Sequence, residues 1–189
     1  MKYFIIIVFL LVSCVGKYSN KSEPEGRING EDSINLLTDL VTQDSIKIDE
    51  IIFGRFCGEC GGNCAPMFRL NTEGNANTLW ADYDNNYFKG TDSLKFETDL
   101  NKSEKLNIAY DVMWKLPRVL REMKTDFKRF GCPDCTDGCG IYLEIRSFSE
   151  NNIRKRFALD LYPQDKDSIP EEVSAYAQYI SLKVNELEK

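Results

Sequence analysis

The sequence predicts an α+β fold, an antiparallel sheet with two main helices packed on one face. Three features predict this fold: stretches that alternate apolar and polar residues, two amphipathic helical stretches, and two cysteine clusters of the same spacing. The chain has 189 residues, of which 42% are hydrophobic and 12% aromatic. A chain of this length and composition can bury the core of a single domain.

Pairs of short strands form the predicted sheet. In the second half of the chain, residues 141–148 and 153–162 alternate apolar and polar side chains on either side of a polar turn. Such alternation is typical of strands that bury one face. We expect corresponding strands near 66–71 and 78–83, and further strands near 46–54 and 93–98.

Two longer helices follow these strand pairs. In the C-terminal helix, Ser168 and Glu171 form a predicted capping box, and Pro170 lies in the first turn. An earlier helix is expected to begin at Asn101 or Ser103 and to end or kink at Pro117. A further turn near 118–123 and a short N-terminal helix at 34–41 are also expected. The residues expected to face the core are Leu106, Ala109, Tyr110, Met113 and Trp114 in the earlier helix and Val173, Tyr176, Ile180, Val184 and Leu187 in the later one.

The charge and the missing histidine exclude several functions. The chain contains no histidine, so it cannot form a Ser-His-Asp triad, a Cys-His pair or a histidine-containing zinc site. Its formal net charge is −6, which gives no electrostatic reason to bind nucleic acid. We therefore expect no nucleic-acid partner, no catalytic residues and a non-enzymatic role.

Six cysteines fall in two clusters with the spacing CxxCxxxC, and Cys132 follows Cys57 by 75 residues. In each half a cysteine loop precedes two predicted strands and a helix. This order predicts an internal pseudo-repeat with halves at about 46–123 and 124–189. The alternative is two similar cysteine loops beside ordinary hairpins. The clusters are Cys57, Cys60, Cys64 and Cys132, Cys135, Cys139.

Three chemistries are open to these cysteines. Six cysteines of an exported protein can form three disulfides, in any of 15 pairings. Alternatively, Cys57, Cys60, Cys132 and Cys135 resemble two zinc knuckles that would supply four thiolates to one structural zinc ion. The third chemistry is thiol–disulfide exchange, since CxxC is the spacing of redox-active dithiols. Glu59 and Asp134 lie inside the two CxxC motifs and disfavour a reactive thiolate.

The N-terminus carries a predicted export signal. Lys2 precedes an apolar run of nine residues, 4–12, about half the length that a membrane span needs. The run ends Leu11-Val12-Ser13-Cys14, which resembles the lipobox of bacterial lipoproteins. The resemblance implies a signal peptide at 1–13, lipidation of Cys14 and a polar tether over 14–33, before a domain at 34–189. The alternative is an ordinary signal peptide with a cysteine beside its cleavage site.

The expected location is the bacterial cell envelope, with a lipid anchor in the membrane and the domain facing the periplasm. Residues 131–138, with their Cys-Pro-Asp-Cys motif, loosely resemble segments of small envelope lipoproteins that have no assigned activity. An envelope protein or a glycan is the expected ligand, and a possible ligand surface comprises Trp80, Tyr83, Tyr87 and Phe88. The leading hypothesis is a binding or structural domain; the alternatives are a zinc-binding module and an envelope thiol–disulfide oxidoreductase.

Overall fold

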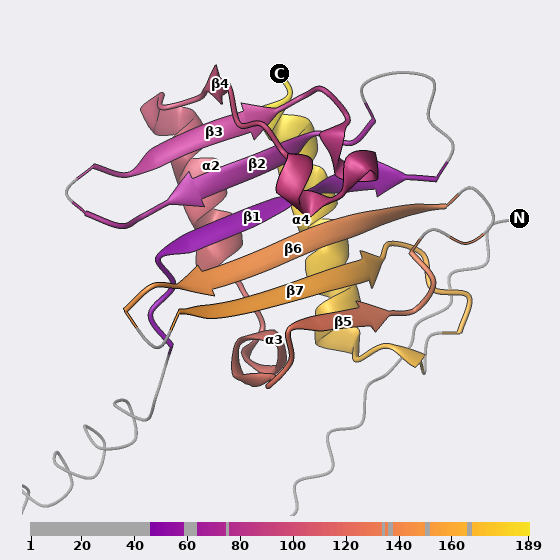
Figure 1. Cartoon of the computed structure of the whole chain (residues 1–189). Helices are drawn as coiled ribbons and strands as arrows, with labels where there is room; N and C mark the ends of the chain where they lie inside the picture. The colour runs from indigo at the N-terminus through magenta and orange to yellow at the C-terminus, as the bar shows by residue number, and fades with distance from the viewer. Residues whose placement is uncertain are drawn as a thin grey trace, which may run out of the picture. The chain divides into compact units, whose positions relative to one another are not determined.

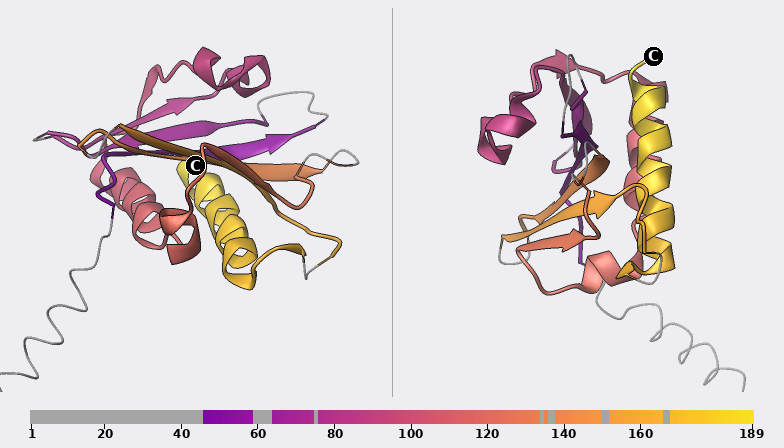
Figure 2. Two further views of the ribbon diagram at one scale, coloured as in Figure 1. Left: turned by 60° about the horizontal axis from the view of Figure 1, so that its bottom comes forward. Right: turned by 90° about the vertical axis from the view of Figure 1, so that its right-hand side faces the viewer.

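The structure is a computed structural model that describes residues 46–58, 64–74, 76–133, 135, 138–149, 152–165 and 168–189. The predictions for the signal peptide, the lipidated cysteine, the tether and the helix at 34–41 lie outside these residues. Within them, seven strands form one mostly antiparallel sheet in the order β4-β3-β2-β1-β6-β7-β5. Helices α2 and α4 lie together on one face of this sheet (Figures 1 and 2), which confirms the predicted fold class.

The predicted strand pairs and main helices are present, and their bounds differ from the expected ones by a few residues. The expected strand at 93–98 is reduced to two residues, Thr98–Asp99, and the strand at Phe127–Phe130 was not predicted. In chain order the elements are β1 (Glu50–Cys57), β2 (Met67–Asn71), β3 (Thr78–Asp82), η1 (Asn86–Lys89), η2 (Thr91–Ser93), β4 (Thr98–Asp99), α2 (Ser103–Trp114), α3 (Arg118–Glu122), β5 (Phe127–Phe130), β6 (Cys139–Ser147), β7 (Ile153–Asp160) and α4 (Glu171–Leu187).

β1 lies in the middle of the sheet because it carries apolar residues on both faces. Ile51 and Phe53 belong to the core beneath the helices, whereas Ile52 and Phe56 belong to a smaller apolar cluster on the opposite face. β1 pairs antiparallel with β2 on one side and with β6 on the other. It therefore joins the two halves of the chain into one sheet.

The main core lies between the sheet and helices α2 and α4. All five predicted core residues of α4 are buried, and the Tyr176 hydroxyl donates a hydrogen bond of 2.7 Å to the Val112 carbonyl of α2. Trp114 was expected in this core but is 72% exposed. It is the last residue of α2 and lies outside the row of buried residues with which this helix faces the sheet. None of the described helices has the length and apolar composition needed to cross a membrane.

The predicted capping box of α4 is wrong. Pro170, not Ser168, is the N-cap residue, and no side chain caps the helix. The Ser168 hydroxyl instead donates to the Asp165 carbonyl at 2.6 Å. The proline ring restricts the preceding residue to extended conformations, so the helix begins only after Pro170.

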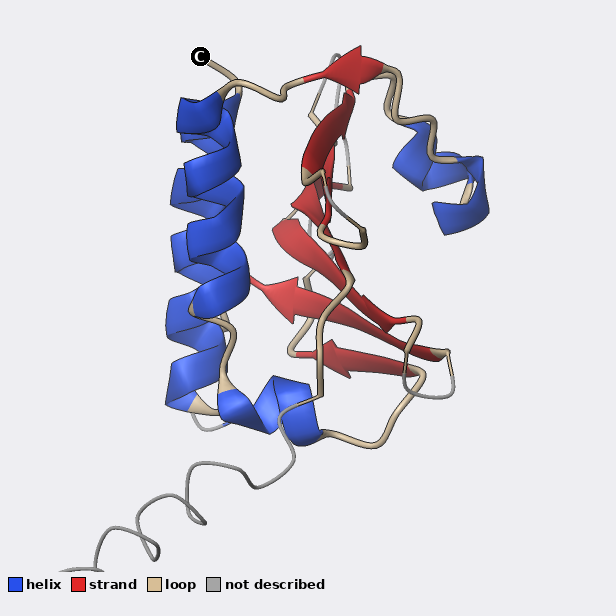
Figure 3. Cartoon of the chain, turned by 90° about the vertical axis from the view of Figure 1, so that its left-hand side faces the viewer, coloured by secondary structure: helices blue, strands red, loops and turns tan. Residues whose placement is uncertain are grey.

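The opposite face of the sheet is covered by the short helices η1 and η2 over part of its width (Figure 3). The ring of Tyr87 in η1 stacks on Phe56, with ring centroids 4.7 Å apart. The buried Asp82 carboxylate accepts hydrogen bonds from the backbone N–H of Asp84 at 2.9 Å and from that of Lys95. Asp82 thus holds both ends of the segment that carries η1 and η2.

The two halves share an order of elements but not a pattern of strand pairing. In each half a strand precedes the cysteine loop, and two strands and a helix follow it. In the first half, the leading strand β1 pairs antiparallel with β2. In the second half, the leading strand β5 pairs parallel with β7 instead of with β6. The structure therefore does not confirm the pseudo-repeat, which stays a prediction.

Candidate functional site

Two disulfides are described, and they differ in kind. Cys57 and Cys139 are directly opposite each other at the end of the β1–β6 ladder, and their disulfide joins residues 82 positions apart. Cys132 and Cys135 form a second disulfide across three positions. Cys64 is also disulfide-bonded. The disulfide prediction is confirmed for these cysteines, and the first disulfide links the two cysteine clusters.

The four predicted zinc ligands do not provide four thiolates in this arrangement. Cys57, Cys132 and Cys135 are in disulfides, and Cys60 lies outside the described residues. Zinc binds thiolates and not the sulfur atoms of a disulfide. Within the described ranges, no group of three or more Cys, Asp or Glu side chains is placed to hold a metal ion.

The Cys132–Cys135 loop is held to the sheet by contacts that do not involve its sulfur atoms. Gly131 has a φ of +68°, and a Cβ at this position would lie 2.8 Å from the Asp160 side chain. The backbone N–H of Cys132 donates to Asp160 Oδ2 at 3.0 Å. Asp160 Oδ1 also accepts from the backbone N–H of Tyr162 at 2.9 Å. One carboxylate at the end of β7 therefore positions both the CxxC loop and the turn that begins at residue 161.

Pro133, the residue after Cys132, fixes the other side of this loop. Its ring is buried against Gly140, where an added Cβ would overlap Pro133 and the ring of Phe56. The Gly58 N–H donates to the Gly138 carbonyl at 3.2 Å, which connects the two cysteine loops directly. The end of β1, the start of β6 and the end of β7 lie side by side at this end of the strands (Figure 1).

The Cys132–Cys135 disulfide opens onto a groove. Both cysteines are exposed and line a cavity of about 520 Å³. A second cavity of about 880 Å³ continues along α4 and shares Tyr162 and Pro163 with the first. We call the two cavities together the 161–163 groove. Its walls along α4 are Leu161, Tyr162, Pro163, Ile169, Glu171, Ser174, Ala175 and Gln178.

The charge of the groove is acidic. Asp160 and Asp165 line the cavity at the disulfide, and Glu171 lines the cavity at α4. No lysine or arginine is among the described residues that line either cavity. The groove therefore favours neutral or basic ligands and opposes anionic ones.

The predicted aromatic ligand surface is not brought together. Tyr83 packs edge-on against Phe68 on the helix-covered face, with ring centroids 6.0 Å apart. Tyr87 packs into the apolar cluster on the opposite face. Trp80 is half-buried, and the side chain of Phe88 lies outside the described part. Since Tyr83 follows β3 on the helix-covered face and Tyr87 lies in η1 on the opposite face, they cannot contact one ligand together.

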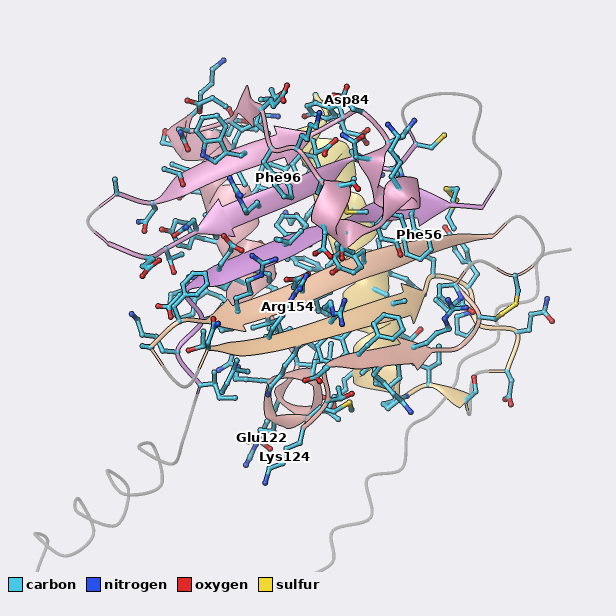
Figure 4. All side chains as sticks on the ribbon, viewed as in Figure 1. Phe56, Asp84, Phe96, Glu122, Lys124 and Arg154 are labelled. Atoms are coloured by element: carbon cyan, nitrogen blue, oxygen red, sulfur yellow. A yellow bond between two sulfur atoms is a disulfide. The ribbon has the colours of Figure 1, made fainter. Side chains whose placement is uncertain are left out.

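A buried charged cluster lies on the face that η1 and η2 cover in part, and Arg154 Nη2 of this cluster is 3.7 Å from Asp92 of η2. The Glu144 carboxylate, 1% exposed, accepts hydrogen bonds from the Tyr142 hydroxyl and from Nε of Arg146 and Arg154, the latter at 2.7 Å. Arg154 and Phe56 both lie on this face, as Figure 4 shows. Although burial alone would raise the pKa of Glu144, these hydrogen bonds and the charge of Arg146 lower it below its ordinary value.

Glu50 belongs to the same cluster but is less well paired. Its Oε1 lies 3.0 Å from Arg146 Nη1, yet that oxygen receives no hydrogen bond of good geometry. Burial raises the pKa of Glu50 above its ordinary value, and the charges of Arg146 and Arg69 offset only part of this shift. The cluster therefore stabilises the charged form of Glu144 and destabilises the charged form of Glu50.

Several of these residues were not found from the sequence. Asp160 and Tyr162 lie inside the strand predicted at 153–162, and nothing local marks them as a site. Glu50 and Glu144 were missed as well. Glu144 alternates with apolar Leu143 and Ile145 as an exposed strand residue would, and Glu50 follows another acidic residue, Asp49.

The fold and the site define a disulfide-bonded α+β domain with an exposed CxxC disulfide beside a groove. Comparison of the chain with protein-family models, with curated proteins and with solved structures finds no match. Its function must therefore be argued from its own residues.

Proposed function

We propose that this protein is a lipid-anchored domain of the bacterial cell envelope that binds a segment of another envelope protein in the 161–163 groove. The observation that carries the proposal is Tyr162, which is 78% exposed at the point where the two cavities adjoin. Exposed tyrosines beside a concave apolar surface are favoured anchors in protein interfaces, because they bury a large area at low entropy cost.

The lining of the groove favours a peptide segment over a glycan. Leu161, Pro163, Ile169 and Ala175 offer apolar contact, and Gln178 offers a hydrogen-bonding amide. Glycan sites commonly depend on flat aromatic stacking together with several polar groups. The acidic rim further favours a segment with basic residues.

The anchor is supported by the lipobox-like residues Leu11 to Cys14 and by the apolar run before them. Two or three acyl chains hold a protein firmly on a bilayer without a transmembrane helix. Replacing Cys14 with serine is expected to move the protein from the membrane fraction to the soluble fraction of lysed cells. Cell fractionation followed by immunoblotting measures this change, and a Cys14→Ser protein that stays with the membrane would contradict the anchor.

The groove can be tested by photo-cross-linking in the cells that make the protein. A photoreactive phenylalanine at position 162 keeps the aromatic ring and is expected to give one protein adduct. Ala175→Trp fills the groove with an exposed side chain and is expected to abolish this adduct. Glu172→Trp adds the same ring to the same helix outside the groove lining, and the adduct should persist.

The possible outcomes separate the alternatives. An adduct that Ala175→Trp does not remove, or no adduct at all, contradicts binding in the groove. An adduct to a glycan, removed by Ala175→Trp, would replace the proposed protein partner with the glycan alternative. Mass spectrometry of the adduct distinguishes these outcomes.

A further inference from the structure

We propose that the Cys132–Cys135 disulfide is a thiol–disulfide exchange site that acts on cysteines of a protein segment bound in the 161–163 groove. This inference adds a reaction to the proposed function and depends on it only for the delivery of the segment. It rests on the exposure of this disulfide, on the independent support of its loop and on its position at the end of the groove.

The two described disulfides are suited to different roles. Cys57–Cys139 is half-buried between paired strands and bridges 82 positions, so it restrains the fold. Cys132–Cys135 is exposed and bridges three positions, so it restrains little of the unfolded chain. Exposed disulfides are the ones that exchange readily, since an incoming thiolate can reach a sulfur atom.

The loop keeps its position when this disulfide opens. The hydrogen bond from Cys132 N–H to Asp160, the burial of Pro133 and the hydrogen bond from Gly138 N–H to the Cys135 carbonyl at 3.0 Å do not use the sulfur atoms. A dithiol and a disulfide can therefore alternate here without local unfolding. Such preorganisation is what repeated exchange requires.

The two cysteines line the groove. Cys132 and Cys135 line the same cavity as Tyr162 and Pro163, and these two residues also line the cavity along α4. Asp160 holds the CxxC loop and the Tyr162 backbone through its two carboxylate oxygens. A segment bound along α4 is thereby directed toward the disulfide.

The exchange is balanced between two dithiol–disulfide pairs. A thiolate of the reduced CxxC attacks a disulfide of the partner, and a mixed disulfide forms as a partner thiolate leaves. The second CxxC thiolate attacks the mixed disulfide, so that Cys132–Cys135 forms and the partner becomes a dithiol. Two electrons and two protons pass to the partner, and the reverse reaction oxidises a partner dithiol. The acidic groove disfavours thiolates, so we expect the rate to rise with pH and with ionic strength.

The test uses the full-length protein in detergent, with insulin as the disulfide substrate and dithiothreitol as the reductant. The protein is expected to accelerate insulin reduction about ten-fold over dithiothreitol alone. Cys132→Ser/Cys135→Ser is expected to abolish this acceleration while the protein melts cooperatively, because the loop contacts are retained. Insulin reduction at the rate of dithiothreitol alone, by protein that circular dichroism shows to be folded, overturns the proposal.

A second measurement separates this proposal from groove binding. Reduced glutathione, which is too small to need the groove, should open Cys132–Cys135 before Cys57–Cys139, as peptide mapping of trapped samples would show. Opening of both disulfides at equal rates overturns the exchange site. Acceleration of insulin reduction that Ala175→Trp leaves unchanged would support the exchange site and contradict delivery through the groove.

Discussion

Replacing Cys57 and Cys139 together with serine is expected to lower the free energy of unfolding by about 4 kcal/mol. The disulfide bridges 82 positions, so it removes a large amount of conformational entropy from the unfolded chain. It also joins β1 to β6 at the end of their ladder, the pairing through which the two halves of the chain become one sheet. A loss of this size is a large fraction of the free energy of unfolding of a typical domain, which is about 5–15 kcal/mol.

The matched control is Cys132→Ser/Cys135→Ser. Since this disulfide closes a loop of only three positions, the same entropy argument gives a loss of about 2 kcal/mol or less. Urea unfolding of both variants without reductant, followed by circular dichroism, measures the difference. Equal losses in the two variants would show that the Cys57–Cys139 disulfide is not the main covalent restraint.

Strands with a buried face could be predicted from the sequence, and a strand without one could not. β6 and β7 alternate apolar and polar residues, and their bounds agree with the predicted ones within two residues. Three of the four residues of β5 are exposed, so no alternation marks it. β5 is held by parallel pairing with β7, a contact that no local pattern encodes.

The cysteine pairing depended on the same long-range information. Fifteen pairings of six cysteines are possible, and the spacing does not choose among them. The register of β1 against β6 places Cys57 opposite Cys139, which still leaves three possible pairings of the other four cysteines. The fold then brings Cys132 and Cys135 together within one turn. That register pairs Phe53 with Leu143, residues about 90 positions apart in the chain, so no local pattern encodes it. The two cysteine motifs can be recognised in the sequence. Only the fold shows that Cys57–Cys139 joins two strands and that Cys132–Cys135 is exposed.

The groove was missed for a related reason. Nothing in the sequence around Tyr162 distinguishes it from a buried tyrosine. Tyr83 and Tyr87, which were predicted to form a ligand surface, fit the sequence criteria for such a surface equally well. What distinguishes them is the side of the sheet to which each is directed, and the turn that Asp160 holds. Tertiary contacts of this kind follow from the fold and not from residue type.

Glu144→Gln is expected to destabilise the protein at pH 7 by about 2 kcal/mol, whereas Glu50→Gln is expected to stabilise it by about 1 kcal/mol. Glutamine at 144 leaves the side chains of Arg146 and Arg154 without their shared carboxylate. Because these side chains are 30% and 37% exposed, water can replace part of what is lost, and the cost stays below that of a fully buried pair. Glutamine at 50 removes a buried charge that lacks a well-formed hydrogen bond.

The two substitutions change the free energy of unfolding in opposite directions, and both changes depend on pH. The pKa of Glu144 is lowered in the folded state, so its contribution is present above the ordinary value of 4.5 and is lost as the pH falls below it. The pKa of Glu50 is raised, so its charged form opposes folding, and this penalty appears only as the pH rises above 4.5. Both differences from the unmodified protein should therefore shrink as the pH falls. The effect of Glu50→Gln disappears as the pH falls to the ordinary value of 4.5 and below, and that of Glu144→Gln only as the pH falls through the lowered pKa of Glu144.

Urea unfolding at a series of pH values from 7 down to 3 measures both effects, and Glu97→Gln serves as the control at an exposed carboxylate. Destabilisation of the protein by Glu50→Gln at pH 7 would contradict the prediction. It would show that the ion pair with Arg146 outweighs the cost of burying Glu50, so that both carboxylates stabilise the cluster. If instead the two variants differ as expected, Glu144 is the centre of the cluster and Glu50 is a charge that the fold tolerates. The stability of this buried charged cluster then depends on the Glu144 carboxylate and on the three side chains that donate to it, Tyr142, Arg146 and Arg154.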